Sequence, residues 1–542
     1  MSSGGVGAQL VESVVILDST FTNTPLGILT AYTISSTTTA GSLAIENSVF
    51  NNVPAIVKGA DGVILAGNTG TFYQGAWVQG NRYIPNGPTH VQTSVASFAR
   101  PAGLVTGSLS KFYTRSKPQY ENVVSADFSS VRSGGAKGDG VTDDTVAIQN
   151  VINSATAAGK IIYFDAGIYK ISNTINIGPG ARIVGEAYPV IMASGSLWNN
   201  IAHPVPVIRV GAAAGQTGVV EWSDMIVSTQ GAMAGAVLIQ WNLASPATTP
   251  SGMWDVHTRI GGFKGSNLQV AECPITGTQP KPGCIAAWQS VLVANIATGL
   301  YMENNWLWTA DHDLDDVENN NTRISVYSGR GISIESITGN IWLVGTSVEH
   351  HSLYQYQIMN SKNIFMGFIQ TETPYYQPDP TAVTVFAPLS GRNDPDFATY
   401  CAGKAATCNM AWALRVLDST SILIYGAGLY SFFNNYDTST SLPFPSPYSF
   451  LSKQDTDTLC FSLACSDHVD GVYNEDCQTQ IVGIDEGGST AYSGSSVFMY
   501  GLNTVGAVSM LDWLGSSVAA QSANTNVFVS SVIRFVTKTP GT

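Results

Sequence analysis

The chain repeats VVILDSTFTNTPLGI (residues 14–28) as LAIENSVFNNVPAIV (residues 43–57), at an offset of 29. Phe21 then aligns with Phe50. A short alternating strand, a turn containing Asn and a second short strand recur, which is typical of coils in a parallel β-helix. Such coils cannot bury their apolar face alone and must stack. We therefore predict an all-β fold, a right-handed parallel β-helix.

A second set of strands follows a helical pattern. GAKGDGVTDD (residues 135–144) precedes this helix, and we expect Thr142 or Asp143 to cap its N-terminus. Its apolar positions share one face: Ile148, Val151, Ile152 and Ala155. Residues 160–186 then show short strands separated by Gly and Pro turns. A helix at this position would cover the open end of the strand stack.

These patterns divide the chain into four segments. They are residues 1–98 as the C-terminal part of a first β-helix, 99–125 as a linker, 126–435 as a second β-helix with a short capping helix, and 436–542 as C-terminal coils and loops. The first coil begins near residue 11 with no capping element before it. We therefore interpret the chain as N-terminally truncated, and the sequence as given has no signal peptide.

The composition excludes several classes of partner. The 542 residues carry a net charge of -14, and only 11% of them are charged. A negative surface repels phosphate backbones and anionic lipid headgroups, so we expect neither nucleic acid nor membrane as a partner. No apolar run approaches the roughly 20 residues that span a bilayer. A neutral ligand and a monomeric protein are expected.

The seven cysteines point to an oxidising compartment. Two pairs lie in loops rich in Pro, Gly and Ala, and we expect local disulfides there: Cys273 with Cys284, and Cys401 with Cys408. The remaining three cannot be paired from sequence: Cys460, Cys465 and Cys477. None of the seven has zinc-site spacing with nearby histidines. We expect no metal and no other cofactor.

A second repeat carries the chemistry. NIWLVGTSVE (residues 340–349) aligns with NIFMGFIQTE (residues 363–372) at an offset of 23. One coil takes a little over 20 residues, so Glu349 and Glu372 should share one face on adjacent strands, ~4.8 Å apart. Two such carboxylates would not both ionise freely, and the pKa of one would be raised. Hydrolysis of a glycosidic bond needs such a pair, although outward-facing glutamates on a solvated sheet are the alternative.

The residues around this pair suit a sugar. WLWTADHDLDD (residues 306–316) lies upstream, and two tyrosines follow Glu372 closely. Aromatic faces stack on sugar rings, and carboxylates accept hydrogen bonds from hydroxyls. The candidate substrate-binding residues are Trp306, Trp308, Asp311, Asp313, His350, Tyr375 and Tyr376. Strand alternation places Trp306 and Trp308 on one side. We interpret His350 as bonding a sugar hydroxyl rather than as part of a charge relay.

Several motifs resemble known proteins. GDGVTDD and the strands after it resemble the start of pectate-lyase-like β-helix enzymes. Four later motifs resemble the second β-helix of fungal glycoside hydrolase family 55: ENNWLWTADHDLDD, YSGRGISIES, WLVGTSVEHHSLYQYQ and MGFIQTETPYYQP. The resemblance implies a secreted exo-β-1,3-glucanase that releases glucose from laminarin-like chains with inversion. It implies that Glu372 is the general acid and that Glu349 helps to hold the attacking water.

Two alternatives remain open. One is a pectin-active enzyme on the same fold, although the Gly-His-Gly signature of galacturonan hydrolases is missing from the sequence and Arg-x-Lys occurs only as Arg115-Ser116-Lys117 in the linker. The other is a carbohydrate-binding β-helix without catalysis, which the missing N-terminal coils would favour. Inverting pairs are also usually ~6.5–9.5 Å apart. Stacked strands bring Glu349 closer to Glu372 than that, so we expect Glu349 to be one member of a water-holding group.

Overall fold

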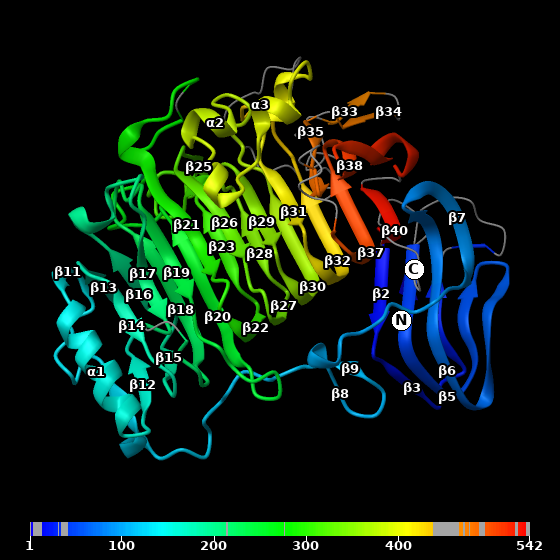
Figure 1. Ribbon diagram of the computed structural model, residues 1–542, viewed down its shortest axis with the longest axis horizontal. Coiled ribbons are helices and arrows are strands. Elements are labelled where there is room, and N and C mark those ends of the chain that lie inside the picture. Colours follow the sequence, from blue (N-terminus) through cyan, green and yellow to red (C-terminus); the bar gives the residue numbers. More distant parts are fainter. Residues whose placement is uncertain are drawn as a thin grey trace.

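The computed structural model describes residues 2–3, 13–30, 32–33, 42–212, 215–275, 277–436, 466–469, 472–475, 477–486, 494–525 and 529–537. Its strands stack in successive coils from α1 at one end to β37 near the other (Figure 1). The all-β, parallel β-helix class predicted from the sequence is confirmed. Cys460 and Cys465 lie outside the described residues.

Two parallel sheets form the walls of the stack. The first has, in order, β12 (Ile161–Phe164), β15 (Arg182–Gly185), β18 (Glu221–Thr229), β20 (Ser251–Ile260), β22 (Thr298–Glu303), β27 (Gly339–Val344), β30 (Lys362–Glu372), β32 (Thr420–Tyr430) and β37 (Val497–Val505). The second has β14 (Ile175–Ile177), β17 (Val205–Val210), β19 (Ala236–Trp241), β21 (Ile285–Val293), β26 (Tyr327–Ile334), β29 (Tyr354–Met359), β31 (Trp412–Leu417) and β36 (Val482–Ile484). Two shorter strands, β23 (Trp306–Thr309) and β28 (Ser347–Glu349), also pair within the first sheet.

Apolar columns between the sheets explain why these sequences stack. One column in the second sheet takes a residue from each of eight coils: Ile175, Ile208, Ile239, Val291, Ile332, Tyr356, Leu414 and Val482. All eight are buried. β-Branched and aromatic side chains pack well on a pleated surface, so each coil covers the apolar face of the next.

Helix α1 (Thr145–Ala157) covers one end of the stack, and its four predicted apolar residues are buried. The helix begins one or two residues later than the predicted caps imply, because Asp144 rather than Thr142 or Asp143 precedes its first turn. The Asp144 carboxylate accepts hydrogen bonds from the amides of Lys137 and Gly138, at 2.7 and 2.9 Å. It therefore closes the preceding turn rather than capping the helix, whereas Oδ1 of Asp143 accepts a hydrogen bond from the amide of Thr145, the first helical residue, at 3.1 Å.

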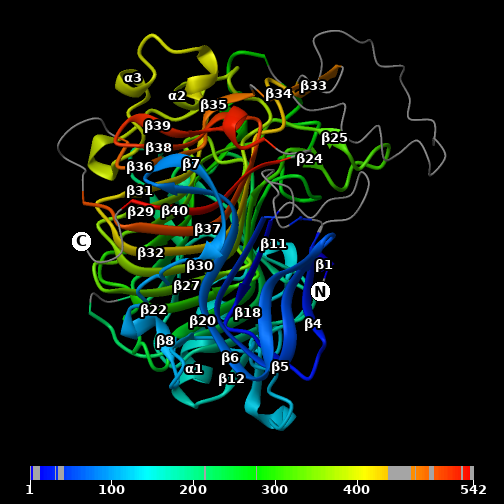
Figure 2. The ribbon, with the colours of Figure 1, turned by 90° about the vertical axis from the view of Figure 1, so that its right-hand side faces the viewer.

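The strands near the N-terminus lie at the opposite end (Figures 1 and 2). β2 (Ser13–Leu17), β3 (Thr20–Thr22) and β4 (Leu26–Thr30) run parallel to β5 (Ser42–Gly59) at the predicted offset, with Phe21 opposite Phe50. β6 (Gly62–Ile84) and β7 (Asn86–Ser94) instead turn back antiparallel. β40 (Ser530–Val536) runs antiparallel to β37 and parallel to β6, which joins the two parts.

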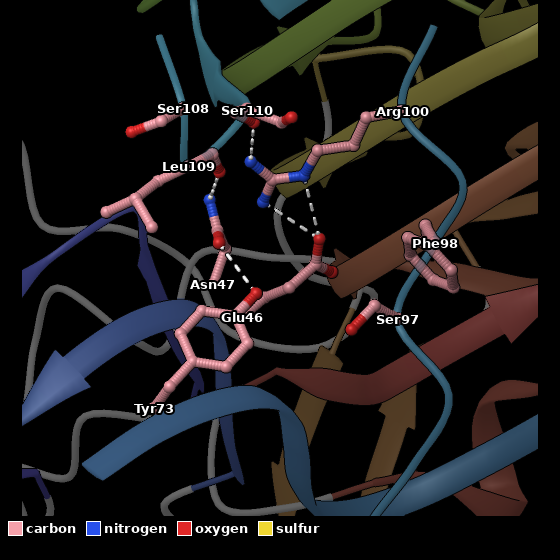
Figure 3. Close-up of a pocket in the computed structure, with 9 residues that line it drawn as sticks. All are labelled: Glu46, Asn47, Tyr73, Ser97, Phe98, Arg100, Ser108, Leu109 and Ser110. Atoms are coloured by element: carbon pink, nitrogen blue, oxygen red, sulfur yellow. Dashed lines mark hydrogen bonds and ion pairs between the residues drawn. The ribbon is translucent and has the colours of Figure 1, made fainter.

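Arg100 ties the following segment to these first coils. Its guanidinium donates to Asp18 at 2.6 Å and to Glu46 at 2.8 Å, and it also binds the Ser110 carbonyl. Arg100, Glu46 and Ser110 are among the residues that line a cavity of about 370 Å³, which Figure 3 shows in close-up. The short hairpin of β8 (Val105–Thr106) and β9 (Lys111–Phe112) is thereby held against the strands.

Candidate active site

Strand register assembles the site from four successive coils. Trp308, Glu349, Glu372 and Tyr430 are cross-strand partners in one column of the first sheet. Two residues earlier on each strand is a second column: Trp306, Ser347, Gln370 and Gly428. The stacking of Glu349 on Glu372, predicted from the offset of 23, is therefore confirmed. Residues two apart point to the same side of a strand, so both columns share one face.

Glu349 is held on both carboxylate oxygens. The indole nitrogen of Trp306 donates to Oε2 at 2.8 Å, and the hydroxyl of Ser347 donates to Oε1 at 2.8 Å. Burial raises the pKa of Glu349; the nearby His350 lowers it, and the neighbouring Glu372 carboxylate raises it further. Glu349 is thus a fixed carboxyl group with an increased affinity for a proton.

Glu372 is held on one oxygen only. Tyr375 donates its hydroxyl to Oε2 at 2.6 Å, and Nε2 of His350 lies 3.3 Å from the same oxygen. Its side chain is 20% exposed. Within the described residues no hydrogen bond reaches Oε1. This oxygen is therefore available to a ligand.

The two tryptophans form an aromatic wall beside the pair. Their rings stack with centroids 5.0 Å apart, which confirms that Trp306 and Trp308 lie on the same side. Trp306 is 40% exposed, whereas Trp308 is buried and also contacts His312. Only Trp306 therefore presents an open ring face.

The acidic segment after β23 separates into two environments. Asp311 lies 3.0 Å from Nδ1 of His312 and 3.6 Å from Nδ1 of His350. Although burial raises the pKa of Asp311, these two histidines outweigh it, and the pKa is lowered. Asp313 is 1% exposed, and its oxygens accept hydrogen bonds from Gln269 and from the Val270 amide. Asp311 belongs to the site, whereas Asp313 holds a loop together.

The residues that follow the two glutamates also lie in two different environments. His350 and Tyr375 contact Glu372, and their rings meet edge to face at 4.7 Å. Tyr376 points into the core, where its hydroxyl lies 2.7 Å from that of Ser352. His351 is also buried and bonds Ser290 and Gln355.

Three further residues of the two columns were not predicted from the sequence: Ser347, Gln370 and Tyr430. Ser347 and Gln370 each precede a glutamate by two positions, and strand alternation could have identified them. Tyr430 lies 58 residues after Glu372, because a long loop interrupts the coil period, so spacing gave no signal.

A cavity of about 1110 Å³ is lined by neighbours of Glu372 but by neither glutamate. Its wall includes Gln370, which lies two residues before Glu372 on β30, and Tyr430, which is the partner of Glu372 on β32. Phe368 also lines the cavity, and 82% of its side chain is exposed. The opposite wall comes from β2 and from Phe112 and Tyr113 of the linker. A polymer that enters this cavity would meet an aromatic surface.

Two disulfides fix loops around the stack. Cys273 bonds Cys284, and Cys401 bonds Cys408, as predicted. Within the part of the chain that the structure describes, no group of three or more His, Cys, Asp or Glu side chains could hold a metal ion. No helix there is long and apolar enough to cross a membrane.

Comparisons with known proteins give one family match and several relatives. Residues 128–246 match the family model described as rhamnogalacturonase A/epimerase, pectate lyase-like. A glucan 1,3-beta-glucosidase of Cochliobolus carbonum is 43% identical over 535 residues, which are 98% of this chain and 62% of that protein. A probable glucan endo-1,3-beta-glucosidase of Arthroderma benhamiae is 40% identical over 82% of this chain and 45% of that protein.

The chain therefore spans less than two thirds of the length of either relative. Among solved structures, sacteLam55A from Streptomyces sp. SirexAA-E matches with 14% identity and a TM-score of 0.45, covering 96% of this chain and 74% of that one.

Proposed function

The chain belongs to the family of the Cochliobolus carbonum glucan 1,3-beta-glucosidase, glycoside hydrolase family 55, and from this premise we propose that it hydrolyses β-1,3-glucan. It releases glucose from chain ends with inversion. The observation that carries the proposal is the pair Glu349 and Glu372, stacked beside the exposed ring of Trp306. The disulfides suit an extracellular enzyme.

Glu372 is the general acid. Its Oε2 already accepts from Tyr375 and faces His350, so the acidic proton is carried on Oε1. As the bond between the anomeric carbon and the glycosidic oxygen breaks, its electrons stay on that oxygen. The oxygen takes the proton from Oε1, and Glu372 becomes a carboxylate.

Glu349 helps to hold the attacking water. The partners of Glu349, Trp306 and Ser347, lie in the column two residues before the glutamates along the strands. The partners of Glu372, Tyr375 and His350, lie in the loops that follow the strands. The two carboxyl groups are thus anchored on different sides although their strands are neighbours. A carboxylate with a raised pKa accepts a proton from water more readily than an ordinary one, which suits a base.

The cavity beside Gln370 and Tyr430 takes the rest of the chain of glucose units. Exposed aromatic rings such as Phe368 offer apolar faces to pyranose rings. A neutral polymer also suits a protein with a net charge of -14, because no anionic group has to approach it.

Glucose release from laminarin by this chain and by Glu372→Gln tests the proposal. We expect the parent to release glucose and the variant to lose nearly all turnover while its circular dichroism spectrum is unchanged. Glu318→Gln, on an exposed loop, is the matched control and should keep full activity. Proton NMR of the first product should show the α-anomer of glucose.

Two results would overturn the proposal. One is turnover of polygalacturonate without turnover of laminarin, which would favour the pectin-active alternative suggested by the match over residues 128–246. The other is laminarin binding by a parent chain that releases no glucose, which would indicate a binding protein.

A further inference from the structure

His350 has an unusual backbone and an enclosed side chain. Its φ is 66°, in the left-handed region that residues other than Gly adopt uncommonly, although Asn, Asp and His do so more often than the rest. The residue is 4% exposed and directly follows Glu349 at the end of β28. Uncommon backbone conformations cluster at functional sites, so this conformation beside Glu349 indicates a role for the His350 side chain.

The two ring nitrogens of His350 face different acceptors. Nδ1 lies 3.0 Å from the carbonyl oxygen of Thr309, which can only accept, so Nδ1 carries a hydrogen. Nε2 lies 3.3 Å from Oε2 of Glu372. With Nδ1 committed, Nε2 is the nitrogen that gains or loses the titrating proton.

Three carboxylates surround this ring. Asp311 lies 3.6 Å from Nδ1, Glu372 contacts Nε2, and Glu349 is adjacent in the chain. The remaining titratable neighbours are the Tyr375 ring and His351. Burial lowers the pKa of His350, but the carboxylates outweigh burial and raise it to about 9. His351, without such partners, has its pKa lowered to about 3 by burial.

We propose that His350 is a positioning residue that orients the Glu372 carboxyl group and holds a positive charge against it. This inference rests on the proposed role of Glu372. The imidazolium donates through Nδ1 to Thr309 and through Nε2 to Glu372, and Asp311 stabilises its charge. Oε2 of Glu372 is thereby occupied, and Oε1 is turned toward the ligand.

The charge has a consequence for proton transfer. When Glu372 gives up its proton, the carboxylate that forms lies against a cation, which stabilises it. Loss of this charge should therefore slow the proton transfer from Glu372 to the leaving oxygen.

His350→Gln tests the charge separately from the hydrogen bond, because a glutamine amide can still donate to Glu372 but is neutral. Removing the cation should leave the carboxylate that forms on Glu372 without a counter-charge, so kcat on laminarin should fall by about tenfold or more. KM should change little. His203→Gln, on an exposed loop, should reproduce the parent kinetics.

His350→Asn provides a second variant in case the glutamine strains the fold. Asparagine adopts the left-handed backbone readily but is too short to reach Glu372. We expect a larger loss of kcat than in His350→Gln, because orientation is lost with the charge. A kcat equal to that of the parent in both folded variants would overturn the proposal.

A readout independent of turnover is the titration of His350 by NMR in protein labelled at the histidine ring carbon. The signal missing from His350→Gln identifies the residue. The parent should titrate near 9, and Asp311→Asn and Glu372→Gln should each lower this value. Titration near the ordinary value of about 6.5 in the parent would overturn the proposal. A parent that titrates near 9 but hydrolyses no laminarin would instead overturn the proposed function alone.

Discussion

Trp306 donates a hydrogen bond from its indole nitrogen to Oε2 of Glu349, at 2.8 Å, although 40% of its side chain is exposed. One side chain therefore fixes a carboxyl group and also offers a ring face to a ligand. The two roles can be separated, because the hydrogen bond needs the indole nitrogen whereas stacking needs only an aromatic ring.

Trp306→Phe should lower kcat on laminarin by about tenfold, since a hydrogen bond to a charged group contributes roughly 1.5–3 kcal/mol. KM should change less, because the phenyl ring still stacks. Trp306→Leu should raise KM as well. Steady-state kinetics of both variants would check this, and equal effects on kcat and KM in both would argue against separate roles.

The sequence predicted the parts of the site that depend on strand period. The offset of 23 between residues 340–349 and 363–372 gave the stacking of Glu349 on Glu372, and alternation gave the shared side of the tryptophans. Both follow from spacing along extended strands, which the sequence states directly.

Features that depend on loops and on pairing direction could not be predicted in this way. Asp313 was expected to bind substrate, but a loop returning through Gln269 covers it. Alternation in residues 62–94 is the same for parallel and antiparallel partners, so the reversal of β6 and β7 left no signal. The contact of His350 with Glu372 requires a left-handed backbone that no pattern indicated.

Glu349→Gln should stabilise the protein while it lowers activity. The pKa of Glu349 is raised above 4.5 in the folded state, so ionisation opposes folding and stability is lost as pH rises above about 4.5. Glutamine never ionises. The variant should therefore unfold at a higher temperature than the parent at pH 7, and at nearly the same temperature at pH 4. Thermal denaturation at both pH values checks this, with Glu318→Gln as the control that should show no such difference.

Removing the Cys273–Cys284 disulfide should affect both stability and the site. The bond joins cysteines 11 residues apart, and opening a loop of this size costs about 2–3 kcal/mol. The Cys273 carbonyl also accepts from the Ser325 amide, next to the strand that pairs with His312 and Asp313. Cys273→Ser with Cys284→Ser should lower the midpoint of urea unfolding and reduce kcat/KM.

The second disulfide is the matched control for that experiment. Cys401 and Cys408 lie 7 residues apart in the loop between β30 and β31, and no contact joins either to the glutamate pair within the described residues. Their replacement by serine should lower stability but leave kcat/KM unchanged. Equal losses of activity in the two double variants would contradict a local effect of Cys273.

Asp394→Asn should destabilise the protein strongly without touching the glutamates. Arg330, 1% exposed on β26, donates through Nε to Oδ1 of Asp394 at 2.8 Å and through Nη2 to its other oxygen, and its guanidinium lies over the Trp288 ring at 3.9 Å. Asparagine leaves the buried guanidinium without a counter-charge. Breaking a buried pair in this way costs about 3–5 kcal/mol.

Replacement of both partners distinguishes the loss of a counter-charge from the loss of packing. Arg330→Met with Asp394→Leu removes both charges and keeps the volume nearly filled, so its free energy of unfolding should fall by less than that of Asp394→Asn. Asp127→Asn, at an exposed position, should leave the unfolding midpoint unchanged. A double variant that is less stable in urea than Asp394→Asn would contradict this prediction. In that case the packing of the Arg330 side chain on Trp288, rather than the ion pair, would hold the segment around Asp394 to the second sheet.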